Sequence, residues 1–312
     1  MKGKNSVLVL LCMFLLLVPQ LVVAQTSFSR LVVFGDSLSD PGNVFALKGW
    51  VNTPPFEYDN PLAIPDKPYA VGGHHFSNGA TWVEQLARSV EMAGNSKPAF
   101  GSDAEPEAGN YAVGGAGAYN RPGYVNLTDQ VDVFLAKAGG VAPADALYIV
   151  EFGANDIRDA LVGNPMLIFE GSFASIAANM QKLYAAGARK FLVPNAPNLA
   201  KTPAIIRSGE AAVIGAALLS GFYNMQLDMV LGGLATLPGI EIVRVDFYGQ
   251  VNAMADTPEK FGFTVVDTPC VTPGEAPFSC HKTDEYLFWD GIHPTRAAHG
   301  FVAEAAADVL MK

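Results

Sequence analysis

The chain has 312 residues, of which 50% are hydrophobic and 16% are charged, so it has enough apolar material for a sizeable core and is not a disordered polymer. Its formal net charge of −10 at pH 7 would repel phosphate backbones and anionic membranes. This acidic balance argues against nucleic acid as a partner.

Residues 1–24 have the layout of a secretory signal peptide. Lys2 and Lys4 form a basic head, an unbroken apolar run covers residues 7–18, and small residues precede a cleavage site after Ala24. A membrane anchor is the alternative, but the run is shorter than the roughly 20 residues that a bilayer span needs. We therefore predict a secreted or periplasmic protein without stable membrane insertion, which loses two lysines on cleavage and so has a net charge of −12.

The predicted mature chain, residues 25–312, alternates short apolar segments with helical patterns. The expected strands are 31–34, 110–113, 146–152, 190–193 and 241–245. The expected helices cover 173–184 (ended by Gly187), about 208–234, and the segment that follows the capping residue Thr295. Apolar strands separated by helices predict a doubly wound parallel sheet covered on both faces, in a single α/β domain.

Two long segments between these elements are predicted as surface loops, at 41–68 and 257–286. We expect the regions 41–78 and 257–287 to build the walls of a substrate pocket. The second loop holds Cys270 and Cys280, which flank a stretch rich in Pro and Gly. In an exported protein a disulfide is the expected state, with two buried free thiols as the alternative.

Polar residues with complementary chemistry follow the strand ends, where the active edge of such a sheet lies. Ser37 comes directly after the first strand, and Asp290 and His293 stand three residues apart before the last helix. A serine hydroxyl needs an adjacent base to become a nucleophile, and a carboxylate fixes the tautomer of that base. These three residues are therefore candidates for nucleophilic catalysis.

Two further turns offer hydrogen-bond donors for the oxyanion that such catalysis forms. The turn at Gly114 and Gly115 supplies backbone N–H groups, and Asn155 supplies a side-chain amide after the third strand. No step of this chemistry requires a cofactor or a cation. The pair His74 and His75 lacks carboxylate or cysteine ligands at metal-binding spacing, so we expect an exposed loop pair and no metal site.

Four blocks of the sequence resemble, in order and spacing, those of the SGNH hydrolases, also called GDSL esterases/lipases. They are Gly35-Asp36-Ser37-Leu38, Asn110-Tyr111-Ala112-Val113-Gly114-Gly115, Gly153-Ala154-Asn155-Asp156 and Asp290-Gly291-Ile292-His293. The resemblance implies a flavodoxin-like three-layer α/β/α sandwich with Ser37 as nucleophile, His293 as base and Asp290 orienting that base. It also implies an oxyanion hole made by the Ser37 N–H, a glycine N–H, for which Gly114 is favoured over its neighbour, and the Asn155 amide.

Within that family the chain most resembles secreted bacterial phospholipase/lecithinase/hemolysin-type acylhydrolases, through residues 194–199 and 284–290. The resemblance implies hydrolysis of acyl esters, with a phospholipid or lysophospholipid as the expected lipid substrate. A carbohydrate acetylesterase on the same fold is the alternative enzyme, and a non-catalytic secreted binding protein is the third hypothesis. Fold alone does not decide among these substrates.

Overall fold

The computed structural model describes residues 28–48, 69–101, 104–272 and 279–311. The signal peptide predicted for residues 1–24 lies outside the described residues, and so do residues 49–68 and 273–278 of the two predicted loops.

A parallel sheet forms the centre of the molecule, with its strands side by side in chain order. The strands are β1 (Arg30–Gly35), β2 (Ala146–Glu151), β3 (Lys190–Pro194) and β4 (Glu241–Val245). Alternate residues of β1 face opposite cores, with Val32 and Phe34 on one side and Leu31 and Val33 on the other. Four of the five predicted strands are thus confirmed, each to within one residue at either end.

The strand predicted at 110–113 is wrong as a regular strand, although the segment does run along the free edge of β1. Its Tyr111 N–H donates to the Val33 carbonyl at 2.7 Å, but only its first residue forms a β-bridge. The reason is a side chain, because the Gly35 N–H donates to Gln130 Oε1 at 2.9 Å and is not available to continue the ladder. If this segment is counted as the second strand in chain order, the order of strands across the sheet is 2-1-3-4-5, as in flavodoxin-like folds.

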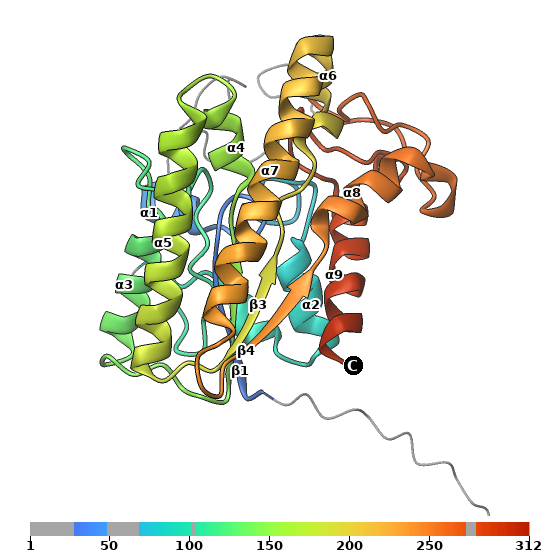
Figure 1. Cartoon of the computed structure of the whole chain (residues 1–312). Coiled ribbons are helices and arrows are strands. Elements are labelled where there is room, and N and C mark those ends of the chain that lie inside the picture. The colour runs from blue at the N-terminus through green and yellow to red at the C-terminus, as the bar shows by residue number, and fades with distance from the viewer. Residues whose placement is uncertain (1–27, 49–68, 102–103, 273–278, 312) are drawn as a thin grey trace, which may run out of the picture.

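Helices cover both faces of the sheet (Figure 1). One face carries α3 (Leu127–Lys137), α5 (Pro165–Ala186) and α7 (Glu210–Leu234), and the other carries α2 (Trp82–Ser89), α8 (Phe247–Asp256) and α9 (Arg296–Leu310). The short helices are α1 (Asn43–Lys48), α4 (Ala154–Ala160) and α6 (Pro203–Arg207), with 3₁₀ turns η1 (Ala93–Ser96), η2 (Leu199–Lys201), η3 (Pro258–Lys260) and η4 (Thr283–Glu285). This arrangement confirms the three-layer α/β/α sandwich.

The three predicted helices are confirmed within α5, α7 and α9, and local signals explain their ends. Asn164 accepts the first N–H groups of α5, and Gly187, at φ 123°, ends that helix. The prediction of a continuous loop at 41–68 is wrong, because α1 lies inside it. The Asp40 carboxylate accepts backbone N–H groups from the start of α1, including that of Val44 at 3.2 Å, and holds this short helix in place.

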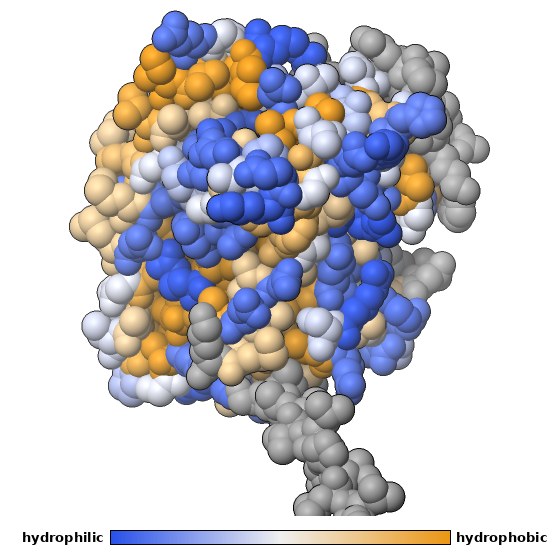
Figure 2. Space-filling model, turned by 90° about the vertical axis from the view of Figure 1, so that its right-hand side faces the viewer, coloured by the Kyte–Doolittle hydropathy of each residue, from blue (hydrophilic) through white to orange (hydrophobic). Residues whose placement is uncertain are grey.

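Several large hydrophobic side chains remain exposed on the surface of the described residues. They gather along α7 and around the ends of α4, α5 and α6 and comprise Val162, Met166, Leu167, Ile206, Ile214, Leu218, Phe222, Met225 and Met229. Figure 2 shows hydrophobic residues collected at the upper edge of the face that it views. Among the described residues, no helix has both the length and the apolar character needed to cross a membrane.

Candidate active site

Three side chains, one from the start of the chain and two from a turn near its end, form a continuous line of hydrogen bonds at the carboxyl edge of the sheet. His293 Nε2 lies 2.9 Å from Ser37 Oγ, and His293 Nδ1 lies 2.7 Å from Asp290 Oδ2. The other carboxylate oxygen of Asp290 accepts the backbone N–H groups of Ile292 and His293 at 2.8 and 2.7 Å. The structure therefore brings together the serine, the imidazole and the carboxylate singled out in the sequence.

Tyr69 is a member of this cluster that sequence reasoning missed. Its hydroxyl donates to Asp290 Oδ2 at 2.6 Å. Burial raises the pKa of Asp290, but the charge of His293 and the hydrogen bonds from His293 and Tyr69 outweigh it, so the net pKa is below the ordinary value. Asp290 is thus held as a carboxylate, which suits an orienting partner of an imidazole.

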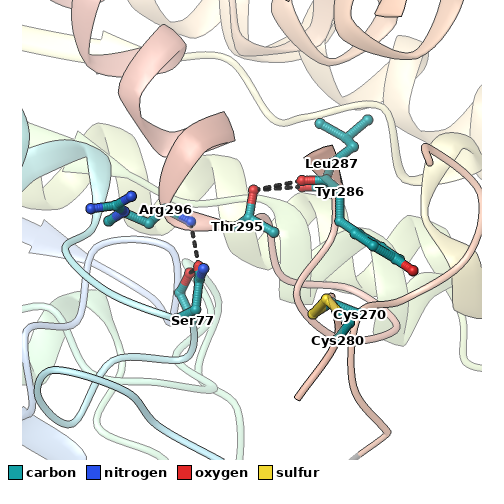
Figure 3. The surroundings of a disulfide bond; sticks show 8 residues. Ser77, Cys270, Cys280, Tyr286, Leu287, Thr295 and Arg296 are labelled. Carbon is teal, nitrogen blue, oxygen red and sulfur yellow. Dashed lines mark hydrogen bonds between the residues drawn. A yellow bond between two sulfur atoms is a disulfide. The ribbon is translucent and has the colours of Figure 1, made fainter. Parts of the chain in front are cut away.

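The turn that carries Asp290 and His293 is fixed by the segments on either side of it. The Trp289 N–H donates to the His293 carbonyl at 2.8 Å, and Thr295 Oγ1 donates to the Tyr286 carbonyl at 2.8 Å while capping α9. Figure 3 shows the hydrogen bond from Thr295 to Tyr286 near the bond that joins Cys270 to Cys280. The turn is consequently tied both to the last helix and to the cysteine loop.

The cysteine loop reaches the same turn through its backbone. The Cys270 N–H donates to the Phe288 carbonyl at 3.1 Å, and the Val271 N–H donates to the Trp289 carbonyl at 2.8 Å. The predicted disulfide is present in the structure, with 10 residues of sequence separation between its cysteines. The disulfide therefore closes a loop whose first two residues hydrogen-bond to the two residues just before Asp290.

The surroundings of the two candidate glycines of the oxyanion hole differ in the structure. The Gly114 N–H donates to Asp40 Oδ2 at 2.8 Å and is therefore already occupied. Burial raises the pKa of Asp40 to about 6, while the N–H groups of Gly114 and of α1 act against that rise. Within the described parts of the chain, the N–H groups of Ser37 and Gly115 have no protein acceptor. Gly115 has φ 80°, and a Cβ there would lie 2.3 Å from the Tyr124 ring, so glycine is required.

Asn155 lies in the first turn of α4 and is only 4% exposed. Its Nδ2 donates to the Ala116 carbonyl at 2.9 Å and to Asp36 Oδ2 at 3.2 Å. The second of these bonds is the longer one, so one amide proton is held less firmly than the other. The amide lies with Ser37 in the wall of one cavity.

That cavity has a volume of about 780 Å³ and is mainly apolar. Besides the polar cluster, its wall includes Val44, Leu47, Phe76, Tyr124, Val125, Val162, Leu199, Ile205 and Ile292, together with the cations Lys48 and Arg158. The first predicted loop region, 41–78, does line it. The prediction for 257–287 is wrong for its described residues, none of which lines the cavity; residues between 197 and 208 take that place.

The prediction that His74 and His75 form an exposed pair is also wrong. His75 is 5% exposed and its Nε2 lies 2.8 Å from the nearer carboxylate oxygen of Glu84, while the ring of His74 stacks on Phe45 with centroids 3.4 Å apart. Both histidine rings therefore contact other side chains of the folded chain. In the part of the chain that the structure describes, no group of three or more His, Cys, Asp or Glu residues is placed to hold a metal ion.

A hydrogen-bonded serine, imidazole and carboxylate at the active edge of a flavodoxin-like sandwich is an arrangement typical of hydrolases that act through an acyl-serine. Residues 31–306 match the model of the GDSL-like lipase/acylhydrolase family, and the chain belongs to this family. It is accordingly an esterase/lipase that hydrolyses acyl esters.

Curated relatives agree with this assignment. The chain is 28% identical to the thermolabile hemolysin of Vibrio parahaemolyticus over 88% of its own length, and it spans 62% of that protein. It is 28% identical to a GDSL esterase/lipase of Arabidopsis thaliana, with 97% and 91% of the two chains covered. It is 27% identical to the phosphatidylcholine-sterol acyltransferase of Aeromonas hydrophila, with 92% and 91% covered.

Solved structures with a similar chain trace are more distant. A lipolytic protein of the G-D-S-L family from Veillonella parvula aligns with a TM-score of 0.45 at 14% identity, over 90% of this chain and 97% of that one. An acetyl-xylooligosaccharide esterase mutant from Geobacillus aligns with a TM-score of 0.48 at 12% identity, over 92% and 96%.

Proposed function

We propose that the protein is an exported lipid acyl hydrolase in which Ser37 is the nucleophile, His293 the general base and Asp290 the group that orients His293. The observation that carries the proposal is the line of hydrogen bonds from Asp290 through His293 to Ser37, in the wall of a mainly apolar cavity. A carboxylic ester bound in that cavity would present its carbonyl carbon to Ser37 Oγ.

The proposed reaction has two halves. His293 Nε2 takes the proton of Ser37 as Oγ attacks the carbonyl carbon, and the same nitrogen returns the proton to the departing alcohol. Water then attacks the acyl-serine by the same proton transfers and releases the carboxylic acid. The oxyanion of each tetrahedral intermediate is stabilised by the N–H groups of Ser37 and Gly115 and by the Asn155 amide.

The apolar wall of the cavity supports a lipid over a small acetyl ester. A cavity of about 780 Å³ exceeds the space that an acetyl group fills, and its side chains offer an acyl chain few polar partners. The relative named phosphatidylcholine-sterol acyltransferase supports a phospholipid or lysophospholipid as the substrate. The cations Arg158 and Lys48 in the wall could face the phosphate of such a lipid.

We also propose that residues 1–24 are a signal peptide and that residues 25–312 form one hydrolase domain. The family match over residues 31–306 and the wide separation of Ser37 from His293 along the chain support a single domain. The disulfide supports an oxidising destination outside the cytoplasm.

Replacement of Ser37 by alanine tests the nucleophile. Ser37→Ala should lower turnover by about 10⁶-fold, because no acyl-enzyme can form, while the circular dichroism spectrum stays unchanged. A fluorophosphonate should label Ser37 and no other serine. Ser89→Ala changes an exposed serine that does not line the cavity, and it should keep normal labelling as a matched control. Normal turnover by Ser37→Ala would disprove the assignment.

The substrate class is tested with p-nitrophenyl esters of increasing chain length, phospholipids, lysophospholipids and acetylated sugars. Preference for long acyl chains and release of fatty acid from phospholipid support the proposal. Activity confined to acetate esters would instead indicate a carbohydrate acetylesterase. Absence of any turnover in a correctly folded protein would indicate a non-catalytic binding protein.

A further inference from the structure

The glycine turn that would supply one N–H group to the oxyanion is held on both sides of that group. On one side the Gly114 N–H donates to Asp40 Oδ2 at 2.8 Å. On the other side the Gly115 carbonyl accepts from Arg121 Nη1 at 2.7 Å. The peptide unit that carries the Gly115 N–H thus lies between two peptide units that are each fixed by a side chain from outside the turn. Gly115 lines the same cavity as Ser37.

Arg121 is itself fixed by Asp159, a residue of α4. Its Nε donates to Asp159 Oδ2 at 2.6 Å and its Nη2 donates to Asp159 Oδ1 at 2.9 Å, so the guanidinium and the carboxylate meet through two parallel hydrogen bonds. The Tyr119 hydroxyl also donates to Asp159 Oδ2, at 2.5 Å. The side chains of Arg121 and Asp159 are only 11% and 21% exposed, which makes the pair firmer than an ion pair on the open surface.

Tyr124 contacts both the guanidinium and the glycine. The guanidinium carbon of Arg121 lies 4.1 Å from the centre of the Tyr124 ring, in a cation–π contact. The same ring forms part of the cavity wall and packs against Gly115, where a Cβ would lie 2.3 Å from it. Gly115 is therefore held by an aromatic ring and by the guanidinium that stacks on that ring.

The backbone that carries Arg121 is restrained as well. Asn126 Nδ2 donates to the Arg121 carbonyl at 2.8 Å, and Asn126 Oδ1 accepts the Gly117 N–H at 3.0 Å. Asn126 is 3% exposed and immediately precedes α3. The segment between the glycine turn and Arg121 is thus joined to the start of α3, so the guanidinium is in place before charge develops in the site.

We propose that Arg121 is a positioning residue of the oxyanion hole, which holds the Gly115 carbonyl at a fixed place relative to α4 and thereby directs the Gly115 N–H toward the oxyanion formed at Ser37. The inference deepens the proposed function and rests on it. Asp159 balances the charge of the guanidinium, so Arg121 acts mainly through position and not through added positive charge. Displacement of the donor would weaken its bond to the oxyanion, because hydrogen bonds depend steeply on distance and angle.

Removal of the guanidinium tests this role. Arg121→Ala should lower kcat on a soluble short-chain ester about 10-fold with KM nearly unchanged, because the loss falls on the transition state. Arg121→Lys keeps the charge but lacks the planar fork that reaches Asp159 and the Gly115 carbonyl together, so it should restore only part of kcat. Circular dichroism checks that both variants fold.

A tetrahedral analogue gives a readout that a merely structural role would not move. A trifluoromethyl ketone adds to a serine nucleophile and so reproduces the oxyanion of the intermediate. Its inhibition constant should rise about 10-fold in Arg121→Ala, in step with the loss of kcat. The corresponding methyl ketone stays largely in the carbonyl form, and it should inhibit the variant and the wild type equally.

Arg189→Ala is the matched control. Arg189 Nη1 donates to the carbonyls of Tyr184 and Ala188 at 2.9 and 2.7 Å, and its guanidinium carbon lies 4.2 Å from the centre of the Tyr184 ring. Arg189 therefore makes the same kinds of contact with backbone and ring, but it stands just before β3, at the edge of the sheet opposite to Ser37. Its replacement should lower Tm without changing kcat or the inhibition constant.

Asp159→Asn tests whether the anchor on α4 is needed. This variant should lower kcat, but by less than twofold once Arg121 is already alanine, because both residues act through the same carbonyl. Should Arg121→Ala fail to fold, Arg121→Lys and Asp159→Asn decide the question, since each should lower kcat and weaken the trifluoromethyl ketone together.

Three results would overturn the inference. They are an unchanged kcat and inhibition constant in a folded Arg121 variant, a rise in KM alone, and an equal loss of kcat in Arg189→Ala. Failure of the proposed function would appear separately, as full turnover by Ser37→Ala.

Discussion

The availability of N–H groups decides which residues can stabilise an oxyanion in this site. Ser37 and Gly115 have N–H groups without a protein acceptor in the described structure, whereas the Gly114 N–H is bound by Asp40. In the proposed mechanism Asn155 is the third donor, and its amide would exchange the longer of its two hydrogen bonds, the one to Asp36, for a bond to the oxyanion. Electrostatic stabilisation of this kind depends on donors already in place before the charge develops.

Loss of the amide donor at position 155 should therefore affect catalysis and not binding. Asn155→Ala should lower kcat by roughly 10²–10³ with little change in KM, which corresponds to about 2.7–4 kcal/mol of transition-state stabilisation. Steady-state kinetics on a soluble short-chain ester measures both constants, and circular dichroism checks the fold. A rise in KM alone would mean that Asn155 binds substrate and does not act on the oxyanion.

The sequence predicted the candidate catalytic residues, whose types and spacing suit the proposed chemistry, but not the residues that contact them. Ser37, Asp290 and His293 could be found because each occurs in a short block with a recognisable order. Tyr69 lies 221 positions from its partner Asp290, and no local pattern predicts such a contact. The hydrogen bond of the Gly114 N–H could not be predicted either, because it depends on the position of the Asp40 carboxylate in the folded chain.

At the level of elements, strands and helices could be predicted where the hydrophobic pattern and the capping residues indicate the same element. The segment at 110–113 shows the limit, because its residues favour an extended chain while the side chain of Gln130 takes the N–H of Gly35 that a regular ladder needs. That competing bond comes from α3, well outside the segment itself. Tertiary contacts thus overrule a correct local preference.

The cysteine loop is the element most directly tied to the turn of Asp290 and His293. The bond between Cys270 and Cys280 restrains residues that hydrogen-bond to the segment at 288–289. The chain-entropy model gives a disulfide that closes a loop of this order about 3 kcal/mol of stabilisation. A displacement of about 1 Å at a catalytic group can cost about 100-fold in rate, so the positional effect should be the larger one.

Cys270→Ser should consequently lower activity at temperatures where circular dichroism still reports a folded sheet. Mass spectrometry of the non-reduced protein should show the two cysteine peptides linked, and the fall in activity should be reproduced by mild reduction of the wild type. If both thiols of the native protein react with an alkylating agent without prior reduction, the bridge does not form. The role of the loop would then depend on its packing and on its backbone hydrogen bonds to Phe288 and Trp289.

At the scale of the whole molecule, the fold buries four carboxyl groups, a feature that the net charge does not reveal. Burial raises the pKa values of Asp36 and Asp40 to about 6 and also raises those of Glu151 and Asp156. All four lie at the carboxyl edge of the sheet, close to the candidate site. Their position follows from the fold and could not be derived from composition, which counts only acids and bases.

These raised pKa values determine how stability should depend on pH. A carboxyl group whose pKa is higher in the folded than in the unfolded state stabilises the folded protein fully below about pH 4, its pKa in the unfolded state. This stabilisation is lost as the pH rises through the pKa of the group in the folded state. His299 acts in the opposite direction, because burial lowers its pKa to about 3 and stability then rises with pH up to about 6.5. The lowered pKa of Asp290 matters only below about pH 4.

Since four raised carboxyl groups oppose one buried histidine, we expect Tm to fall by about 5 °C between pH 5 and pH 8. Differential scanning calorimetry at constant ionic strength measures the profile. Glu151→Gln should reduce the slope, because the variant has no proton to lose at that position, while Ser208→Ala should follow the wild type. A Tm that rises steadily from pH 5 to pH 8 would show that His299 dominates and that the buried carboxyl groups are ionised without penalty.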